Sequence, residues 1–168
     1  ESRLLADAAR QRFPDACVEL ICLGIDPDHH KKVPATQRRE WRAALDIPED
    51  ATVFLSARGI GDGYRQPEIL KAFASALCDL PAQSRLAMIE LTRGWDRRER
   101  VQELKALASR LGVADHVCWL PELRHVMMPG VYGACDYVIN YPVADAFPST
   151  VMEAVARGGP GISADLPA

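Results

Sequence analysis

The sequence predicts an α/β fold in which a parallel sheet is flanked by helices. Short apolar runs of the length of buried strands alternate with longer amphipathic stretches, which is the pattern of repeated strand–helix–strand units. A glycine-rich loop follows the clearest strand, and a later strand leads through a short loop into an apolar helix. The 168 residues, 48% of them apolar, can bury one sizeable core. We therefore expect a single domain over residues 1–168, with about six parallel strands.

The first part of the chain is expected to contain two helices and two strands. In order, these are a helix over 2–12, a strand over 17–23, a helix over 37–45 and a strand over 52–57. Trp41 and Leu45 lie one turn apart on one side of the second helix. His29 and His30 lie in the loop before it. Because neighbours in sequence rarely converge on one metal ion, we expect a solvated loop and no metal site there.

A glycine-rich loop, Arg58-Gly59-Ile-Gly-Asp-Gly-Tyr-Arg65, follows the strand over 52–57. Its three glycines let the backbone approach a ligand closely, and Arg58 and Arg65 bring positive charge that suits a diphosphate. The loop has neither the spacing of a dinucleotide-binding fingerprint nor that of a Walker loop, so both classes are set aside. The alternative is that the arginines are exposed loop residues without a ligand.

The second part of the chain continues the alternation. In order, the expected elements are a helix over 67–80, a strand over 86–91, a helix over 97–111, strands over 117–120 and 137–141, and a last helix that begins near Pro148. Arg93 or Trp95 could contact a ligand, but the pattern favours an exposed loop around them. Tyr132 and Asp136 are expected to be structural.

The stretch from Asp145 to Gly161 contains the strongest candidate site. Pro148 suits the first turn of a helix and Gly158 suits a left-handed helix end. The apolar residues between them predict a helix that is largely buried. Glu153 is the one acidic residue of this apolar helix, and a carboxylate there is costly unless it lies in a crevice or is bonded to a partner.

The arrangement of strand, short loop and helix suits an anionic ligand. Unpaired N–H groups and the helix dipole favour phosphate at the helix start, which lies at the carboxyl edge of a parallel sheet. Further along the helix, Glu153 could accept hydrogen bonds from ribose hydroxyls, and Asp145 could accept from another hydroxyl. The alternative is that Asp145 only caps the helix and that Glu153 faces solvent.

The same stretch resembles the nucleotide-sugar-binding motif of retaining glycosyltransferases of the GT-B architecture, known as glycosyl transferases group 1. Asp145 and Glu153 stand at the two acidic positions of that motif, with seven residues between them, and Ala146-Phe147-Pro148 replaces the usual Gly-Phe-Gly. The resemblance covers about residues 18–168. Further matching segments are Glu153–Gly158, Gly24–Asp26 and Leu111–Pro121.

The resemblance implies a Rossmann-like, donor-binding domain, the C-terminal half of a two-domain enzyme. The last elements of that half and the N-terminal acceptor-binding domain would be missing. Arg58 and Arg65 would stabilise the departing diphosphate, Asp145 would hold the donor sugar or its phosphate neighbourhood, and Glu153 would hold the ribose. Other implied donor contacts are Leu120 and Pro121 at the nucleobase, and Gly59, Phe147, Ser149 and Thr150. Neither a metal ion nor a cofactor is implied, because the arginines and the helix end would take over that role.

The expected partner is therefore a nucleotide diphosphate sugar, with UDP and GDP both open. A net charge of −3 argues against nucleic acid or an anionic membrane as the main partner. No apolar run approaches the roughly 20 residues of a membrane helix. Five scattered cysteines without a CxxC spacing favour a reducing compartment. We expect a cytoplasmic protein. Peripheral association of the full-length protein with a membrane surface stays open.

Two alternatives to the glycosyltransferase interpretation stay open. A sugar-nucleotide epimerase of the same architecture would use a similar half. A degenerate donor domain could instead serve as a non-catalytic interaction or scaffold module. The shorter Asp145, together with Ala146 and Pro148 in place of glycines, supports that second alternative.

Overall fold

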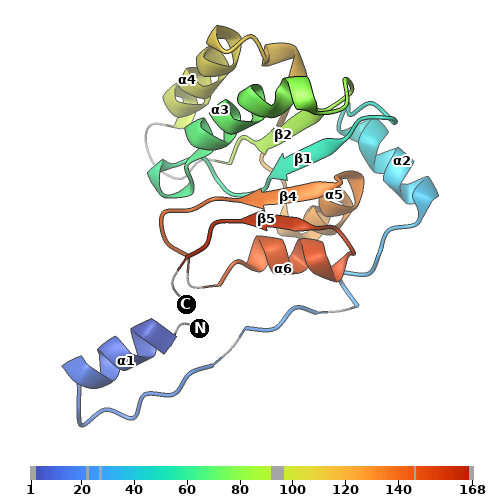
Figure 1. Cartoon of the computed structure of the whole chain (residues 1–168). Coiled ribbons are helices and arrows are strands. Elements are labelled where there is room, and N and C mark those ends of the chain that lie inside the picture. Colours follow the sequence, from blue (N-terminus) through green and yellow to red (C-terminus); the bar gives the residue numbers. More distant parts are fainter. Residues whose placement is uncertain (1–2, 22, 27, 92–96, 146, 167–168) are drawn as a thin grey trace.

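A sheet of five parallel strands forms the centre of the computed structural model, which describes residues 3–21, 23–26, 28–91, 97–145 and 147–166 (Figure 1). The strands lie in the order β3-β2-β1-β4-β5. They are β1 (Val53–Ser56), β2 (Arg85–Ile89), β3 (Val117–Leu120), β4 (Tyr137–Asn140) and β5 (Gly161–Ser163). The α/β class with a parallel sheet is confirmed, with five strands in the described part where the sequence suggested about six.

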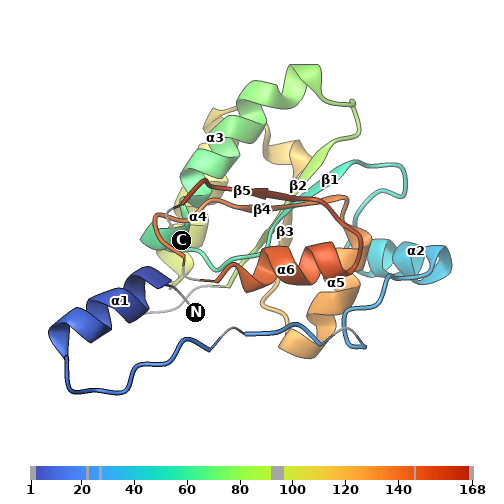
Figure 2. The same ribbon diagram turned by 60° about the horizontal axis from the view of Figure 1, so that its bottom comes forward.

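Helices cover the two faces of the sheet in pairs (Figures 1 and 2). On one face lie α3 (Gln66–Ala76) and α4 (Arg97–Arg110), and on the other lie α5 (Met128–Ala134) and α6 (Ser149–Ala156). A further helix, α2 (Ala35–Ala44), packs against α5. This arrangement follows from right-handed crossovers, because the chain moves across the sheet in one direction up to β3 and in the other direction from β4 onward.

The pleat of β1 shows how the sheet separates two cores. Val53 and Leu55 are fully buried in the group of side chains beneath α5 and α6. Phe54, between them, packs with the group beneath α3 and α4. Successive side chains of a strand point to opposite faces, so a strand that is covered on both sides reads as a continuous apolar run.

The N-terminal region lies apart from this sheet. The predicted helix is present as α1 (Arg3–Arg12), which Figures 1 and 2 both show away from the strands. The predicted strand over 17–23 is wrong, because its described residues are extended but form no strand. Ile21 is 72% exposed. An apolar run becomes a strand only where a neighbouring strand pairs with its backbone groups.

The helix α5 is not predicted by the sequence pattern. It is short, and it contains Pro129, Gly130 and Gly133, which are poor helix formers in an isolated chain. Its stability comes from close packing on α2, because Gly130 faces the indole of Trp41. The glycine permits an approach that a side chain would block.

We expect Gly130→Ala to lower the free energy of unfolding by about 1–3 kcal/mol. The added Cβ would lie 1.9 Å from Cε2 of Trp41, so α5 and α2 would have to separate. Urea denaturation followed by circular dichroism measures the change. Gly63→Ala is the matched control, because a Cβ there meets no atom within 4 Å. Equal unfolding midpoints for the two variants would contradict the prediction.

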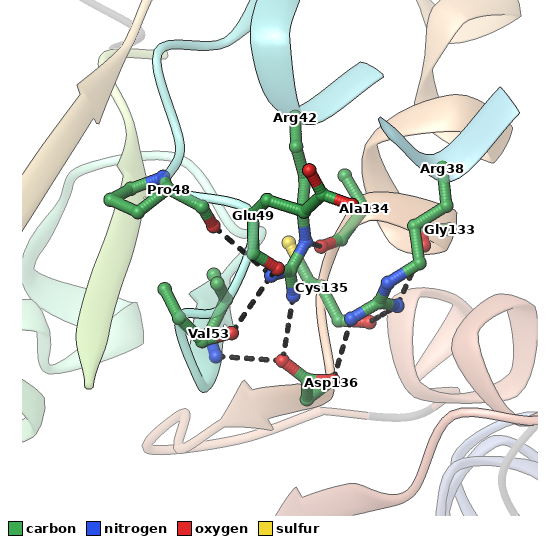
Figure 3. A network of polar contacts seen from close by, with 10 residues as sticks. Arg38, Arg42, Pro48, Glu49, Val53, Gly133, Ala134, Cys135 and Asp136 are labelled. Atoms are coloured by element: carbon green, nitrogen blue, oxygen red, sulfur yellow. Dashed lines mark hydrogen bonds and ion pairs between the residues drawn. The ribbon is translucent and has the colours of Figure 1, made fainter. Parts of the chain in front are cut away.

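A buried arginine connects α2 to the strands that precede the site (Figure 3). The guanidinium of Arg42 donates to the carbonyls of Pro48, Glu49, Ala51 and Ala134. It also donates to Asp136 at 2.9 Å, and the same carboxylate oxygen accepts the N–H of Val53 at 2.8 Å. The network therefore fixes the start of β1 beside the start of β4. Asp136 is structural, as the sequence suggests.

Candidate donor-binding cleft

A cleft of about 710 Å³ opens at the carboxyl ends of β1, β2 and β3. Its walls come from the loop after β1, the loop after β3, α5 and the start of α6. This edge of a parallel α/β sheet is where ligands bind in such folds. The lining residues used below are Arg58, Tyr64, His125, Tyr132, Thr150 and Glu153.

Internal hydrogen bonds hold the glycine-rich loop in place. The N–H of Ile60 donates to the carbonyl of Leu91 at 2.6 Å. A Cβ on Gly59 would lie 2.9 Å from that same oxygen, so this glycine is required by the neighbouring backbone. The buried amide of Gln66 donates to the carbonyl of Gly59 and accepts the N–H of Gly61. The sequence analysis missed Gln66, whose role depends on where the loop folds back.

Arg58 and Asp145 form an ion pair at the edge of the cleft. Nη2 of Arg58 lies 2.7 Å from Oδ2 of Asp145, and both side chains are largely buried. The amide of Asn140 donates to the same oxygen at 3.1 Å, and the N–H of Phe147 donates to Oδ1 at 3.3 Å. Asp145 thus accepts a backbone N–H in the loop before α6 and is also the ion-pair partner of Arg58. Nε of Arg58 and Oδ1 of Asn140 are buried and have no hydrogen-bond partner in the described part of the chain.

The two arginines of the glycine-rich loop do not converge. Arg58 lies over the ring of Tyr64 at 4.9 Å, and both residues line the cleft. Arg65 has a left-handed backbone (φ 50°), and its guanidinium lies over the ring of Tyr141 at 5.2 Å. It lines a different hollow, of about 630 Å³, which also contains Arg100. The left-handed backbone at Arg65 turns the chain, so that Tyr64 lines the cleft and the next residue, Arg65, lines the other hollow.

The side chains of α6 are buried in the opposite way to the one that the sequence predicts. Met152 and Val155 are 43% and 53% exposed, whereas Glu153 is only 8% exposed. The prediction of a largely buried apolar helix is therefore wrong, because α6 packs on β4 and β5 with one side only. The predicted left-handed end is present at Gly158 (φ 83°). A buried carboxylate on a helix with exposed apolar side chains points to a specific role for the carboxylate.

Glu153 faces the cleft, which Tyr132 also lines. Nε2 of His125 lies 3.7 Å from Oε1 of Glu153. Burial raises the pKa of the Tyr132 hydroxyl, and the negative charge of Glu153 adds to the increase. Glu153 thus lies in a crevice, which is one of the two conditions from the sequence analysis.

The two adjacent histidines differ in their surroundings, since His30 is buried close to Glu153 and His29 is exposed. His30 is buried, which lowers its pKa, and its Nδ1 has no hydrogen-bond partner among the described residues. His29 is exposed and stacks on His125, with ring centroids 6.3 Å apart. The expectation of a solvated loop is therefore wrong for His30. Within the described residues, no group of three or more His, Cys, Asp or Glu side chains is placed to hold a metal ion.

The remaining candidate residues divide between the cleft and its surroundings. Ser149 and Thr150 line the cleft, and Oγ1 of Thr150 is buried with no hydrogen-bond partner in the part of the chain that the structure describes. Leu120 is part of the core and Pro121 is exposed, while the next residues, Glu122 and Leu123, line the cleft. The candidates Arg93 and Trp95 lie outside the described residues.

Comparison with known proteins identifies the family. The sequence model of the glycosyl transferases group 1 family matches residues 37–168. The chain belongs to this family. A D-inositol 3-phosphate glycosyltransferase of Saccharomonospora viridis is 31% identical over 163 residues, which cover 95% of this chain and 36% of that protein. One of Streptomyces scabiei is 26% identical, over 89% of this chain and 33% of that protein. The chain thus spans about a third of the length of these relatives.

Solved structures show that the GT-B glycosyltransferase fold extends over nearly the whole chain. HepE of Anabaena, solved with UDP-glucose, has a TM-score of 0.77 at 22% identity, over 96% of this chain and 44% of HepE. Sucrose-phosphate synthase of Thermosynechococcus elongatus has a TM-score of 0.72 at 19% identity, over 99% of this chain and 40% of the synthase. The Rossmann-like fold that the sequence predicts is confirmed. In the described part of this family member, no helix is long and apolar enough to cross a membrane.

Proposed function

We propose that the chain is the donor-binding domain of a retaining glycosyltransferase and that the cleft binds a nucleotide diphosphate sugar. One observation carries the proposal: a buried carboxylate, Glu153, and a guanidinium, Arg58, line the same cleft at the carboxyl edge of the sheet. A nucleotide diphosphate sugar offers hydroxyls to a carboxylate and phosphates to a cation. Membership of the family and the location of the cleft support the proposal.

The proposed donor occupies the cleft with its phosphates near Arg58 and the start of α6. Arg58 stabilises the charge that develops on the departing diphosphate, as preorganised groups do in a site that excludes water. The buried hydroxyl of Thr150, which has no partner among the residues that the structure describes, supplies a further hydrogen bond. Glu153 accepts hydrogen bonds from the ribose, and the loop at Glu122 and Leu123 holds the nucleobase. This arrangement requires neither a metal ion nor a cofactor.

The donor and acceptor classes are suggested by the relatives. HepE was solved with UDP and with UDP-glucose, so a UDP-sugar is the first donor to test, with a GDP-sugar as the second. The curated relatives are named D-inositol 3-phosphate glycosyltransferases. Because the chain spans about a third of their length, we propose that a separate N-terminal domain binds the acceptor and completes the enzyme.

Isothermal titration of the chain with UDP, GDP and UMP tests the proposal. We expect heat with one of the two diphosphates and weaker binding of UMP, which lacks the second phosphate. Glu153→Gln should weaken binding of the preferred diphosphate about tenfold, because a neutral amide accepts ribose hydrogen bonds less strongly than a carboxylate. Glu103→Gln on the exposed side of α4 is the matched control. Absence of heat with both diphosphates at high protein concentration would refute the proposal.

A non-catalytic interaction domain of the same fold is the second candidate. It is favoured by the charge of the cleft: among the described lining residues Arg58 is the single arginine and no lysine is present. That arginine is already paired with Asp145. Glu153→Ala in the full-length protein separates the two candidates. Loss of sugar transfer supports the enzyme, and unchanged function supports the interaction domain.

A further inference from the structure

Glu122 lines the cleft at some distance from the proposed phosphate ligand, Arg58. It follows the end of β3, as Arg58 follows the end of β1. The strand order β3-β2-β1-β4 places one strand between them. Because neighbouring strands lie about 4.8 Å apart, β3 and β1 are separated by about 10 Å. Glu122 and Arg58 therefore line different parts of the same cleft.

A contact between the loop after β3 and α6 indicates which part of a nucleotide would meet Glu122. Nε2 of His125, in the same loop region as Glu122, lies 3.7 Å from Oε1 of Glu153. The proposed ribose ligand thus lies beside the loop that carries Glu122. A nucleoside diphosphate has its ribose between the phosphates and the base. With the phosphates at Arg58 and the ribose at Glu153, the base reaches the loop after β3.

The cleft offers this base apolar walls and one charged side chain. Ile89 and Leu91, at and just after the end of β2, and Leu123, beside Glu122, supply the apolar part of the lining. Contacts of this kind with the face of a base tolerate every base, because each has a similar face. Glu122 is exposed, and its carboxylate has neither a hydrogen bond nor an ion pair within the described residues. It is therefore available to bond to the edge of the base.

A carboxylate in this position favours guanine over uracil. Guanine presents two adjacent donors, N1–H and the N2 amino group, and the two oxygens of a carboxylate can accept one bond from each. Uracil presents a single N3–H between two carbonyls, whose oxygens would face the carboxylate. Paired hydrogen bonds to a charged group combine strength with geometric specificity. Glu122 thus matches the edge of guanine and opposes that of uracil.

We propose that Glu122 is a specificity-determining residue that selects guanine, so that the sugar donor is a GDP-sugar. The inference rests on the proposed function, because it takes the cleft to bind a nucleoside diphosphate. It goes beyond that function by choosing between the two bases that the proposed function leaves open. It assigns this choice to one side chain of the loop after β3.

Isothermal titration of the chain with GDP, IDP and UDP tests the choice of base. IDP is GDP without the N2 amino group, so it keeps only one of the two proposed bonds. We expect the unaltered chain to bind GDP about tenfold more tightly than IDP, because one hydrogen bond to a charged group is lost. UDP should also bind more weakly than GDP, by about tenfold or more.

Glu122→Ala separates base recognition from a general role of the loop. The side chain is exposed, so its removal leaves the core intact. We expect the variant to bind GDP and IDP equally, because neither retains its partner at the edge of the base. Binding of UDP should not weaken, since the carboxylate that opposes its carbonyls is gone. Asp115→Ala is the matched control, because it removes the same charge from an exposed position at the amino end of β3.

The other outcomes overturn the inference in distinguishable ways. If the unaltered chain binds UDP more tightly than GDP, or binds GDP and IDP equally, guanine selection is refuted and the proposed function stands. These comparisons need no variant. An equal loss for all three ligands in Glu122→Ala would show that Glu122 only supports the loop. If the unaltered chain binds none of the three, the proposed function fails and the inference fails with it.

Discussion

Replacing Arg42 with methionine is expected to lower the free energy of unfolding by about 3–5 kcal/mol, a large part of the stability of a typical domain. The guanidinium is buried and donates to four carbonyls and to Asp136 (Figure 3). Methionine fills similar space but supplies no donor. The carbonyls and the carboxylate would then be left with unmet hydrogen bonds in the interior.

The matched control for this prediction is Arg39→Met on the same helix. Arg39 is exposed, and Glu49 lies 3.8 Å away as its ion-pair partner, so its loss should cost less than about 0.5 kcal/mol. Urea denaturation followed by circular dichroism compares the two variants. Arg42→Lys should also be strongly destabilised, because one ammonium group cannot reach acceptors on several segments. Similar unfolding midpoints for Arg42→Met and Arg39→Met would show that the network contributes little.

The largest expected effect on ligand binding is that of Arg58→Met, which should weaken binding of a nucleoside diphosphate on the order of 100-fold. Two effects act in the same direction. The variant removes the guanidinium proposed to bind the phosphates. It also leaves the largely buried carboxylate of Asp145 without its ionic partner, so that a negative charge faces the anionic ligand. Isothermal titration with UDP or GDP measures the loss.

A double variant and a matched single variant make this prediction specific. Asp145→Asn in addition to Arg58→Met removes the unpaired charge and should recover part of the lost affinity. Arg65→Met removes the same charge from the other side of the loop, where Arg65 lies over Tyr141, and should have a much smaller effect. Equal losses for Arg58→Met and Arg65→Met would contradict the assignment of Arg58 as the phosphate ligand.

Much of the fold was predictable because its signals are local. The expected strands over 52–57, 86–91, 117–120 and 137–141 correspond to β1 to β4, whose apolar runs have the length of buried strands. The elements that were missed depend on distant partners. α5 exists because α2 packs against it, and the described residues of the segment over 17–23 form no strand because their backbone finds no strand to pair with.

The candidate site was predictable in its acidic positions and less so in its surroundings. The spacing of Asp145 and Glu153 about a helix start is a local property, and Glu153 lies in the cleft as the sequence analysis proposed. The partners of these residues come from other segments. Gln66 holds the glycine-rich loop, Asn140 bonds to Asp145, and Tyr132 lines the cleft beside Glu153.

The sequence by itself determined the class of fold, the order of most elements and the positions of the acidic pair, because each of these follows from periodicity or spacing within a short stretch. Only the tertiary structure decided which arginine faces the cleft and that Glu153 is buried beneath exposed apolar neighbours. The physical reason is that the direction and the burial of a side chain are set by the segments packed against it. Those segments meet only when the sheet and its helices assemble.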